Sequence, residues 1–140
     1  MALFTMAGCA CGTLAAVLTA VQPPAGFVAR GIQYPVWLVG ITIAALALAN
    51  AFGEEILWRG ALLETQAQWP VAVTYAVQAG SFGLAHLNGT PVGIPGLVVT
   101  AAFACAALWC HRRYGLLASI VLHSAADLVL FIEVFRINNA

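Results

Sequence analysis

Long apolar stretches, separated by proline, glycine and polar turns, dominate the chain. A helix needs about 20 mostly apolar residues to cross a bilayer core, and most of these stretches come close to that length. The turn signals between them are Pro23-Pro24, Pro70, Asn88-Gly89-Thr90-Pro91 and the basic segment His111-Arg112-Arg113. The pattern predicts five membrane helices, at residues 3–21, from 36 to before Pro70, and at 71–87, 92–110 and 116–134. We therefore expect an all-α, multi-span transmembrane bundle.

The second stretch carries charge inside it. Residues 36–52 contain no ionisable side chain, and the next few residues bring Glu54, Glu55 and Arg59. No proline occurs between Pro35 and Pro70, so one helix is expected to continue through these charges. Glu55 and Arg59 stand four residues apart and share a face, which favours an ion pair, whereas Glu54 points about 100° away. We expect a structural Glu55–Arg59 pair and a chemically available Glu54, the alternative being that all three charges mark the membrane interface.

The composition places the whole chain in the membrane. Its 140 residues are 63% hydrophobic and 7% charged, with a mean hydropathy of +0.97, far from the soluble average. We expect a single transmembrane domain over residues 1–140, with a first stretch that is retained because it lacks the features of a signal peptide. The net charge is zero and no basic stripe is present, which excludes nucleic acid as a partner. Four cysteines, at spacings of neither CxxC nor zinc-finger type, are expected to be apolar packing residues.

Three further ionisable side chains fall inside apolar stretches: His86, His123 and Asp127. Such groups are costly in lipid and usually face a functional cavity. At 1.5 Å per residue, Glu54, His86 and His123 lie at depths of about 18, about 22 and about 10 Å from one membrane side, so they are able to converge. A single buried histidine is more often a satisfied core residue, but each of these needs a polar partner, and the candidates are one another.

These residues form three motifs on successive helices: Glu54-Glu55-x-x-x-Arg59, Phe82-x-x-x-His86 and His123-x-x-x-Asp127. Their order and spacing resemble the CPBP family of intramembrane proteases, also called Abi, which comprises CAAX prenyl endopeptidases of type II and bacteriocin-processing enzymes. The resemblance covers about residues 36–133. The chain is shorter than typical members, so it is either a minimal member or a truncated one. Asp127 stands where the family usually has Asn, and an ionised Asp accepts hydrogen bonds but does not donate them.

The resemblance implies an intramembrane endopeptidase. By it, Glu54 is the general base, His86 positions the attacking water, and His123 with Asp127 faces the tetrahedral intermediate. Glu55, Arg59 and Phe82 are then supporting residues. Because a carboxylate aimed at an oxyanion is repulsive, we expect Asp127 to orient the His123 ring instead. The implied substrates are membrane-attached peptides, either CAAX-type or bacteriocin-like.

Metal dependence has two readings. The family is named as metalloprotease, and two histidines with one glutamate match a known kind of catalytic zinc site. The sequence nevertheless has neither HExxH nor a cysteine-rich zinc pattern. We therefore favour catalysis without a cofactor, the alternative being zinc held by Glu54, His86 and His123.

Two other functions remain as alternatives to proteolysis. The charged cluster would also suit a non-catalytic binding or scaffold pocket in the membrane. A proton or ion conduit ranks lower, because the first and fourth stretches offer no ionisable group inside the bilayer. In every case the chain is expected to be a multi-pass protein of the lipid bilayer, and we expect the cell membrane.

Overall fold

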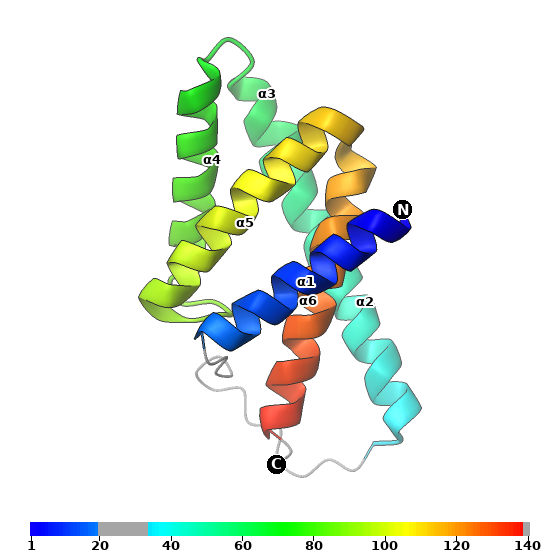
Figure 1. Ribbon diagram of the computed structural model, residues 1–140. Coiled ribbons are helices and arrows are strands. Elements are labelled where there is room, and N and C mark those ends of the chain that lie inside the picture. The colour runs from blue at the N-terminus through cyan, green and yellow to red at the C-terminus, as the bar shows by residue number, and fades with distance from the viewer. Residues whose placement is uncertain (20–33, 139–140) are drawn as a thin grey trace.

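The computed structural model describes residues 1–19 and 34–138, which are helical apart from short connections. The elements are α1 (Ala2–Thr19), α2 (Val36–Glu55), the π-helix η1 (Ile56–Leu62), α3 (Leu63–Thr65), α4 (Val71–Ala85), α5 (Gly93–Tyr114) and α6 (Leu116–Asn138) (Figure 1). No strand occurs in these two ranges. The predicted all-α class is therefore confirmed, while the turn predicted at Pro23-Pro24 lies outside the described residues.

Within the part of the chain that the structure describes, four helical segments are long and apolar enough to cross a membrane: Ala2–Thr19, Val36–Thr65, Gly93–Tyr114 and Leu116–Arg136. The apolar helix α4 has 15 residues, a rise of about 22 Å, which is short of a bilayer core about 30 Å thick. Its end differs by two residues from the prediction because the chain already turns at His86, with φ −94° and ψ 5°. The chain is thus an integral membrane protein with the predicted helices in place.

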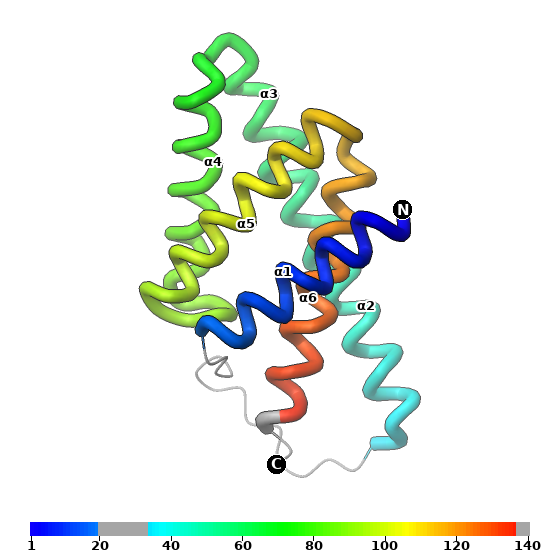
Figure 2. The backbone as a smooth tube through the Cα atoms, viewed as in Figure 1, coloured from blue at the N-terminus to red at the C-terminus, as the bar shows by residue number. Residues whose placement is uncertain are grey.

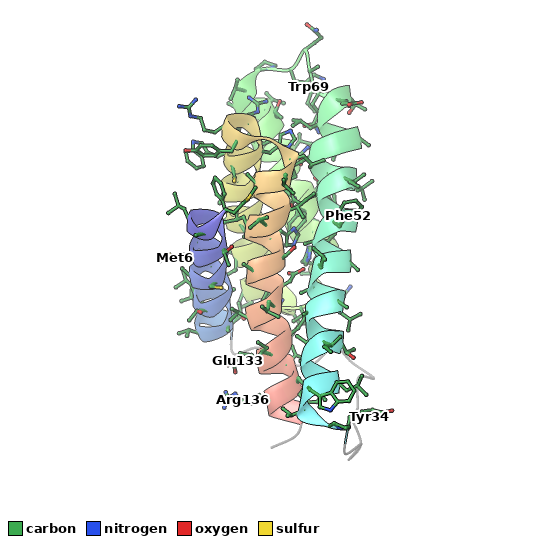
Figure 3. The ribbon with its side chains drawn as sticks, turned by 90° about the vertical axis from the view of Figure 1, so that its right-hand side faces the viewer. Met6, Tyr34, Phe52, Trp69, Glu133 and Arg136 are labelled. Carbon is green, nitrogen blue, oxygen red and sulfur yellow. The ribbon has the colours of Figure 1, made fainter. Side chains whose placement is uncertain are left out.

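The longest segment joins α2, η1 and α3 into one continuous helix, Val36–Thr65. Its continuity through Glu54, Arg59 and Glu64 agrees with the absence of proline between Pro35 and Pro70. The change from α to π hydrogen bonding at Ile56 is a local feature that the hydrophobic pattern does not indicate. Figure 3 shows this helix running beside α6, with Tyr34 near its lower end and Trp69 beyond its upper end.

Helix α6 is the centre of the bundle. It packs against α1, α2 and α5, while α4 packs mainly against α5. Figure 2 shows α1 crossing α6. A Cβ atom at Gly8 would collide with the carbonyl oxygen of Leu122, and one at Gly12 with that of Ala126. These two glycines, four residues apart, allow the close backbone approach that small residues give membrane helix pairs.

The surface and the centre have the polarity expected in lipid. Large apolar side chains lie on the outside, with Met6 70% exposed and Phe52 53% exposed (Figure 3). The buried set, in contrast, contains charged and polar side chains, among them Glu55, Arg59 and His123. Polar groups therefore gather where helices meet, away from the lipid-facing surface.

Candidate active site

The predicted site residues lie where the α2–η1 helix, α4 and α6 meet. They are, in chain order, Glu54, Glu55, Arg59, Phe82, His86, His123 and Asp127. Their contacts divide them into two groups. We call Glu55, Arg59 and the Nδ1 edge of His123 the inner layer. We call Glu54, His86, Asp127 and the Nε2 edge of His123 the outer layer.

The inner layer is tightly bonded. Glu55 Oε1 accepts a hydrogen bond from Arg59 Nη1 at 2.8 Å, which is the ion pair that the helical offset predicts. The same oxygen lies 2.8 Å from His123 Nδ1. Arg59 Nη2 donates to the carbonyl oxygen of Ala104 in α5 at 3.2 Å. Glu55, Arg59 and His123 are 0%, 2% and 3% exposed. Their buried hydrogen bonds therefore join the α2–η1 helix, α5 and α6.

The Glu55–His123 bond is a finding that the sequence did not suggest. We expected Asp127 to orient the His123 ring, but the bond that fixes the ring at Nδ1 comes from Glu55. Asp127 lies on the opposite edge, with Oδ1 3.5 Å from His123 Nε2. Glu55 therefore contacts both Arg59 and the histidine.

The π-helix is held from α4. A π-helix shifts backbone hydrogen bonding to i→i+5, and such segments frequently occur at functional sites. The carbonyl oxygen of Trp58 in η1 accepts a bond from Gln78 Nε2 at 2.9 Å, and Gln66 Oε1 is 3.3 Å from the same nitrogen. Gln66 and Gln78 are 2% and 1% exposed. The sequence did not lead us to expect either glutamine to support the site. Gln78 was nevertheless recognisable as a polar side chain inside the predicted helix at 71–87.

Phe82 contacts both layers from α4. Its ring centroid is 4.9 Å from the guanidinium carbon of Arg59, a cation–π distance. The same ring lies 4.4 Å from the ring centroid of His86 and 5.9 Å from that of His123. Phe103 of α5 also packs against His123, with 4.9 Å between the ring centroids. The two phenylalanines therefore limit the positions that the histidine rings can adopt.

The outer layer is loosely bonded. Glu54 Oε2 lies 3.6 Å from His123 Nε2 and 3.9 Å from His86 Nε2, both too long for a hydrogen bond. This oxygen is buried and has no hydrogen-bond partner among the described residues. The side chain of Glu54 is 26% exposed, compared with 0% for that of Glu55. The neighbouring glutamates thus have opposite surroundings, as their helical offset predicted.

The hydrogen bonds of the two histidines define which nitrogens face Glu54. His86 Nδ1 lies 2.9 Å from the carbonyl oxygen of Phe82, and His123 Nδ1 contacts the Glu55 carboxylate. Both partners only accept hydrogen bonds, so both Nδ1 atoms carry the proton. In neutral rings, Nε2 is then an acceptor in each case. Three acceptor atoms face one another without a donor, which is a place suited to a water molecule that donates hydrogen bonds.

A cavity of about 240 Å³ adjoins this group. His86, His123 and Asp127 line it together with apolar residues of α1 and α5, while Glu54 borders it only through the histidine rings. The cavity therefore has a small polar patch in otherwise apolar walls, as substrate pockets usually do.

Asn50 belongs to the site although the sequence analysis passed over it. Its Nδ2 donates to Asp127 Oδ2 at 2.9 Å, which links α2 to α6. Asn50 precedes Glu54 by four residues and so lies on the same helix face. The position of Asn50 in the uncharged residues 36–52, one turn before Glu54, could have indicated that it belongs to the site.

The arrangement does not fit a metal ion. Within residues 1–19 and 34–138, no group of three or more His, Cys, Asp or Glu side chains is placed to hold one. Glu54, His86 and His123 are of the donor types that zinc uses, but they do not form such a group. No step of the reaction below passes through a metal.

Comparison with known proteins identifies the family. Residues 35–129, more than half of the chain, match the family model described as type II CAAX prenyl endopeptidase Rce1-like. Searches among curated proteins and among solved structures found no match. The matched region contains all three motifs and closely follows the predicted core at 36–133. The chain therefore belongs to the Rce1-like family of type II CAAX prenyl endopeptidases.

Proposed function

We propose that this membrane-embedded protease cleaves a peptide bond of a membrane-attached substrate with a water molecule activated by Glu54. The observation that carries the proposal is the unpartnered Glu54 Oε2 facing the Nε2 atoms of His86 and His123. A water held beside Glu54 Oε2 donates one hydrogen bond to this oxygen and the other to Nε2 of His86, while Nε2 of His123, whose ring carries both protons throughout, faces the substrate carbonyl. That position is the one a general base needs.

The reaction follows from these positions. Glu54 takes a proton from the water, and the resulting hydroxide attacks the carbonyl carbon of the scissile peptide bond. His86 orients the water through Nε2. The proton on Glu54 then passes to the leaving nitrogen as the C–N bond breaks. Each proton is accounted for without another reactant.

His123 stabilises the tetrahedral intermediate from the other side. To donate from Nε2 while Nδ1 bonds Glu55, the ring must carry both protons, and the Glu55 and Asp127 carboxylates on its two edges offset that charge. An oxyanion donor of this kind contributes about 2.7 to 4 kcal/mol to transition-state stabilisation. Asp127 acts on His123 from the Nε2 edge of its ring. Asn50 holds the Asp127 carboxylate in this position by donating a hydrogen bond to it.

The substrate is a peptide anchored in the bilayer, of CAAX or bacteriocin-like type, and the site of action is the cell membrane. The family assignment favours a prenylated CAAX peptide. An apolar cavity with few polar groups agrees with a substrate that partitions into lipid.

The experiment compares two glutamate variants of one helix. Glu54→Gln should lower the rate of cleavage of an S-farnesylated CAAX peptide by about 10²–10⁴-fold, the usual contribution of a general base. Its folding, followed by size exclusion in detergent, should be unchanged, because Glu54 makes no hydrogen bond to the described residues through the atom concerned. Glu64→Gln, an exposed glutamate of the same helix, should cleave normally. Equal activity of Glu54→Gln and wild type would overturn the assignment and favour a binding or scaffold role.

A further inference from the structure

A second cavity, of about 690 Å³, lies between α2 and α6 and leads toward the site. One wall includes a stripe of residues four apart, namely Tyr34, just before α2, and Leu38, Thr42, Leu46 and Asn50 of α2. The next position of this stripe is Glu54. On α6, its wall includes Phe131 and Phe135, and the preceding positions of that stripe are Asp127 and His123. We call this cavity the α2–α6 groove.

The two stripes run in opposite chain directions and meet at the catalytic group. Figure 3 shows α2 and α6 side by side, with Tyr34 and Arg136 at the same end of the molecule. From there the groove extends about 18 Å, the rise from Leu38 to Asn50. It reaches the Asn50–Asp127 hydrogen bond, and Thr90 lines both the groove and the smaller cavity of the histidines. The groove therefore ends at Asn50, whose side chain is bonded to Asp127 of the site.

Asn50 presents unused hydrogen-bonding groups to this groove. One N–H is bonded to Asp127, while the side-chain carbonyl and the second N–H bond no described residue. A carboxamide left unsatisfied in an apolar environment is energetically costly. Its free donor and acceptor match the acceptor and donor of a peptide group.

We propose that the α2–α6 groove binds the hydrocarbon-bearing part of the substrate and that Asn50 hydrogen-bonds the substrate main chain. This inference rests on the proposed function, because the ligand is the peptide cleaved at Glu54. The rise from Asn50 to Glu54 is about 6 Å, which equals about two residues of extended chain. Asn50 thus holds a peptide group about two residues from the scissile bond.

The groove is tested by two matched tryptophan variants. Leu46 lines it and Leu48 does not, and both are 57% exposed. Leu46→Trp should fill the groove and raise KM for an S-farnesylated CAAX peptide by about tenfold, a change of about 1.4 kcal/mol, with a smaller effect on kcat. Leu48→Trp should leave both constants unchanged. Equal KM values for the two variants would overturn the groove as the binding site.

The role of Asn50 is tested with an altered substrate. Replacing the peptide N–H about two residues from the scissile bond by an ester oxygen removes one hydrogen bond. It should cost the wild type about three- to tenfold in kcat/KM. Asn50→Ala should lose this sensitivity. Asp127→Ala, which breaks the same Asn50–Asp127 bond, should keep it. If Asn50→Ala stays as sensitive as the wild type, Asn50 acts only on Asp127, and the proposed contact is wrong.

A binding measurement separates this inference from the proposed function. In a Glu54→Gln background, a fluorescent S-farnesylated CAAX peptide should bind, and Leu46→Trp should weaken that binding by about tenfold. If binding of the peptide depends on Leu46 but neither the wild type nor any variant cleaves it, the groove is the binding site and the proposed protease function is wrong. If the wild type cleaves but binding of the peptide is indifferent to Leu46→Trp, the substrate does not use the groove and the inference fails alone.

Discussion

The inner and outer layers of the polar centre share His123 but differ in how closely their atoms are bonded. In the inner layer, Glu55 lies 2.8 Å from both Arg59 and His123 Nδ1. In the outer layer, the nearest distances from His123 Nε2 are 3.5 Å to Asp127 and 3.6 Å to Glu54. The distances on the two edges of the ring are thus 2.8 Å on one side and 3.5 or 3.6 Å on the other. This difference indicates that the inner layer holds the ring and that the outer layer leaves space for water and substrate.

The inner layer is not fully satisfied. Glu55 Oε2 and Arg59 Nε have no hydrogen-bond partner among the described residues, and the Phe82 ring centroid lies 4.9 Å from the guanidinium carbon. Burying an ion pair seldom adds much stability over an apolar pair, whereas removing one partner is costly. The layer is therefore best understood as a positioning device for His123.

Breaking the inner layer should have the largest effect on folding. Arg59→Leu leaves the carboxylate of Glu55 buried without its cation, at a cost of about 3–5 kcal/mol. We expect a lower thermal unfolding temperature in detergent together with loss of cleavage. Arg136→Leu is the matched control, because it removes an exposed i,i+3 pair with Glu133 that contributes at most about 1 kcal/mol. Equal unfolding temperatures for the two variants would show that the inner layer does not hold the bundle.

Loosening the support behind the inner layer should have a smaller effect. Gln78→Leu leaves the Trp58 carbonyl of the π-helix unsatisfied, which costs about 1–3 kcal/mol. It should also shift Arg59 relative to Glu54 and so lower kcat more than it raises KM. Ser81→Ala, on the same helix, removes only local bonds to the backbone carbonyls of Val77 and Gln78 and should change neither stability nor kcat. If Gln78→Leu matches Ser81→Ala, the π-helix is stable without α4.

The pattern of the sequence predicted the helices and the charged face for definite reasons. Helix ends followed from proline and turn residues, and the Glu55–Arg59 pair followed from a spacing of four. The π-helix could not be predicted, because it depends on Gln78 and Gln66 meeting Trp58 through tertiary contacts. The spacing of Gly8 and Gly12 is typical of close packing between membrane helices, and it could have predicted the contact of α1 with α6.

The partners of the histidines were harder to assign from sequence. Spacing places His123 and Asp127 on one face, yet it does not say which ring nitrogen each carboxylate meets. Glu55 was assigned to Arg59 alone, although one carboxylate oxygen accepts from both Arg59 and His123. Asn50 was overlooked because its partner lies 77 residues away along the chain. Motif spacing thus identifies the cluster, while distances between helices decide its chemistry.

Within the outer layer, a conservative change at Asp127 should have only a mild effect on activity. In Asp127→Asn, the new side-chain carbonyl can still accept from Asn50, and its N–H₂ group then faces the space beside His123 Nε2. Activity should be retained or raised, with any change below about 1.4 kcal/mol, or tenfold. Asp127→Leu, which loses the bond to Asn50, should be much less active. If Asp127→Asn is as inactive as His123→Ala, the carboxylate itself is required as a proton carrier.

Removing metal ions should have the smallest effect on cleavage and on stability. The experiment tests whether the outer layer activates water without a metal. A zinc ion would need its ligand atoms at about 2.0–2.2 Å, which would draw Glu54, His86 and His123 around a common centre. Among the described residues, Glu54 Oε2 has no hydrogen-bond partner, and this free carboxylate oxygen can take a proton from water. Purified protein treated with a strong chelator should therefore keep its cleavage rate and its unfolding temperature, and elemental analysis should find far less than one metal per chain. Stoichiometric zinc that leaves together with activity and restores it on return would make these three residues metal ligands, and the water would then be activated by the metal rather than by Glu54 alone.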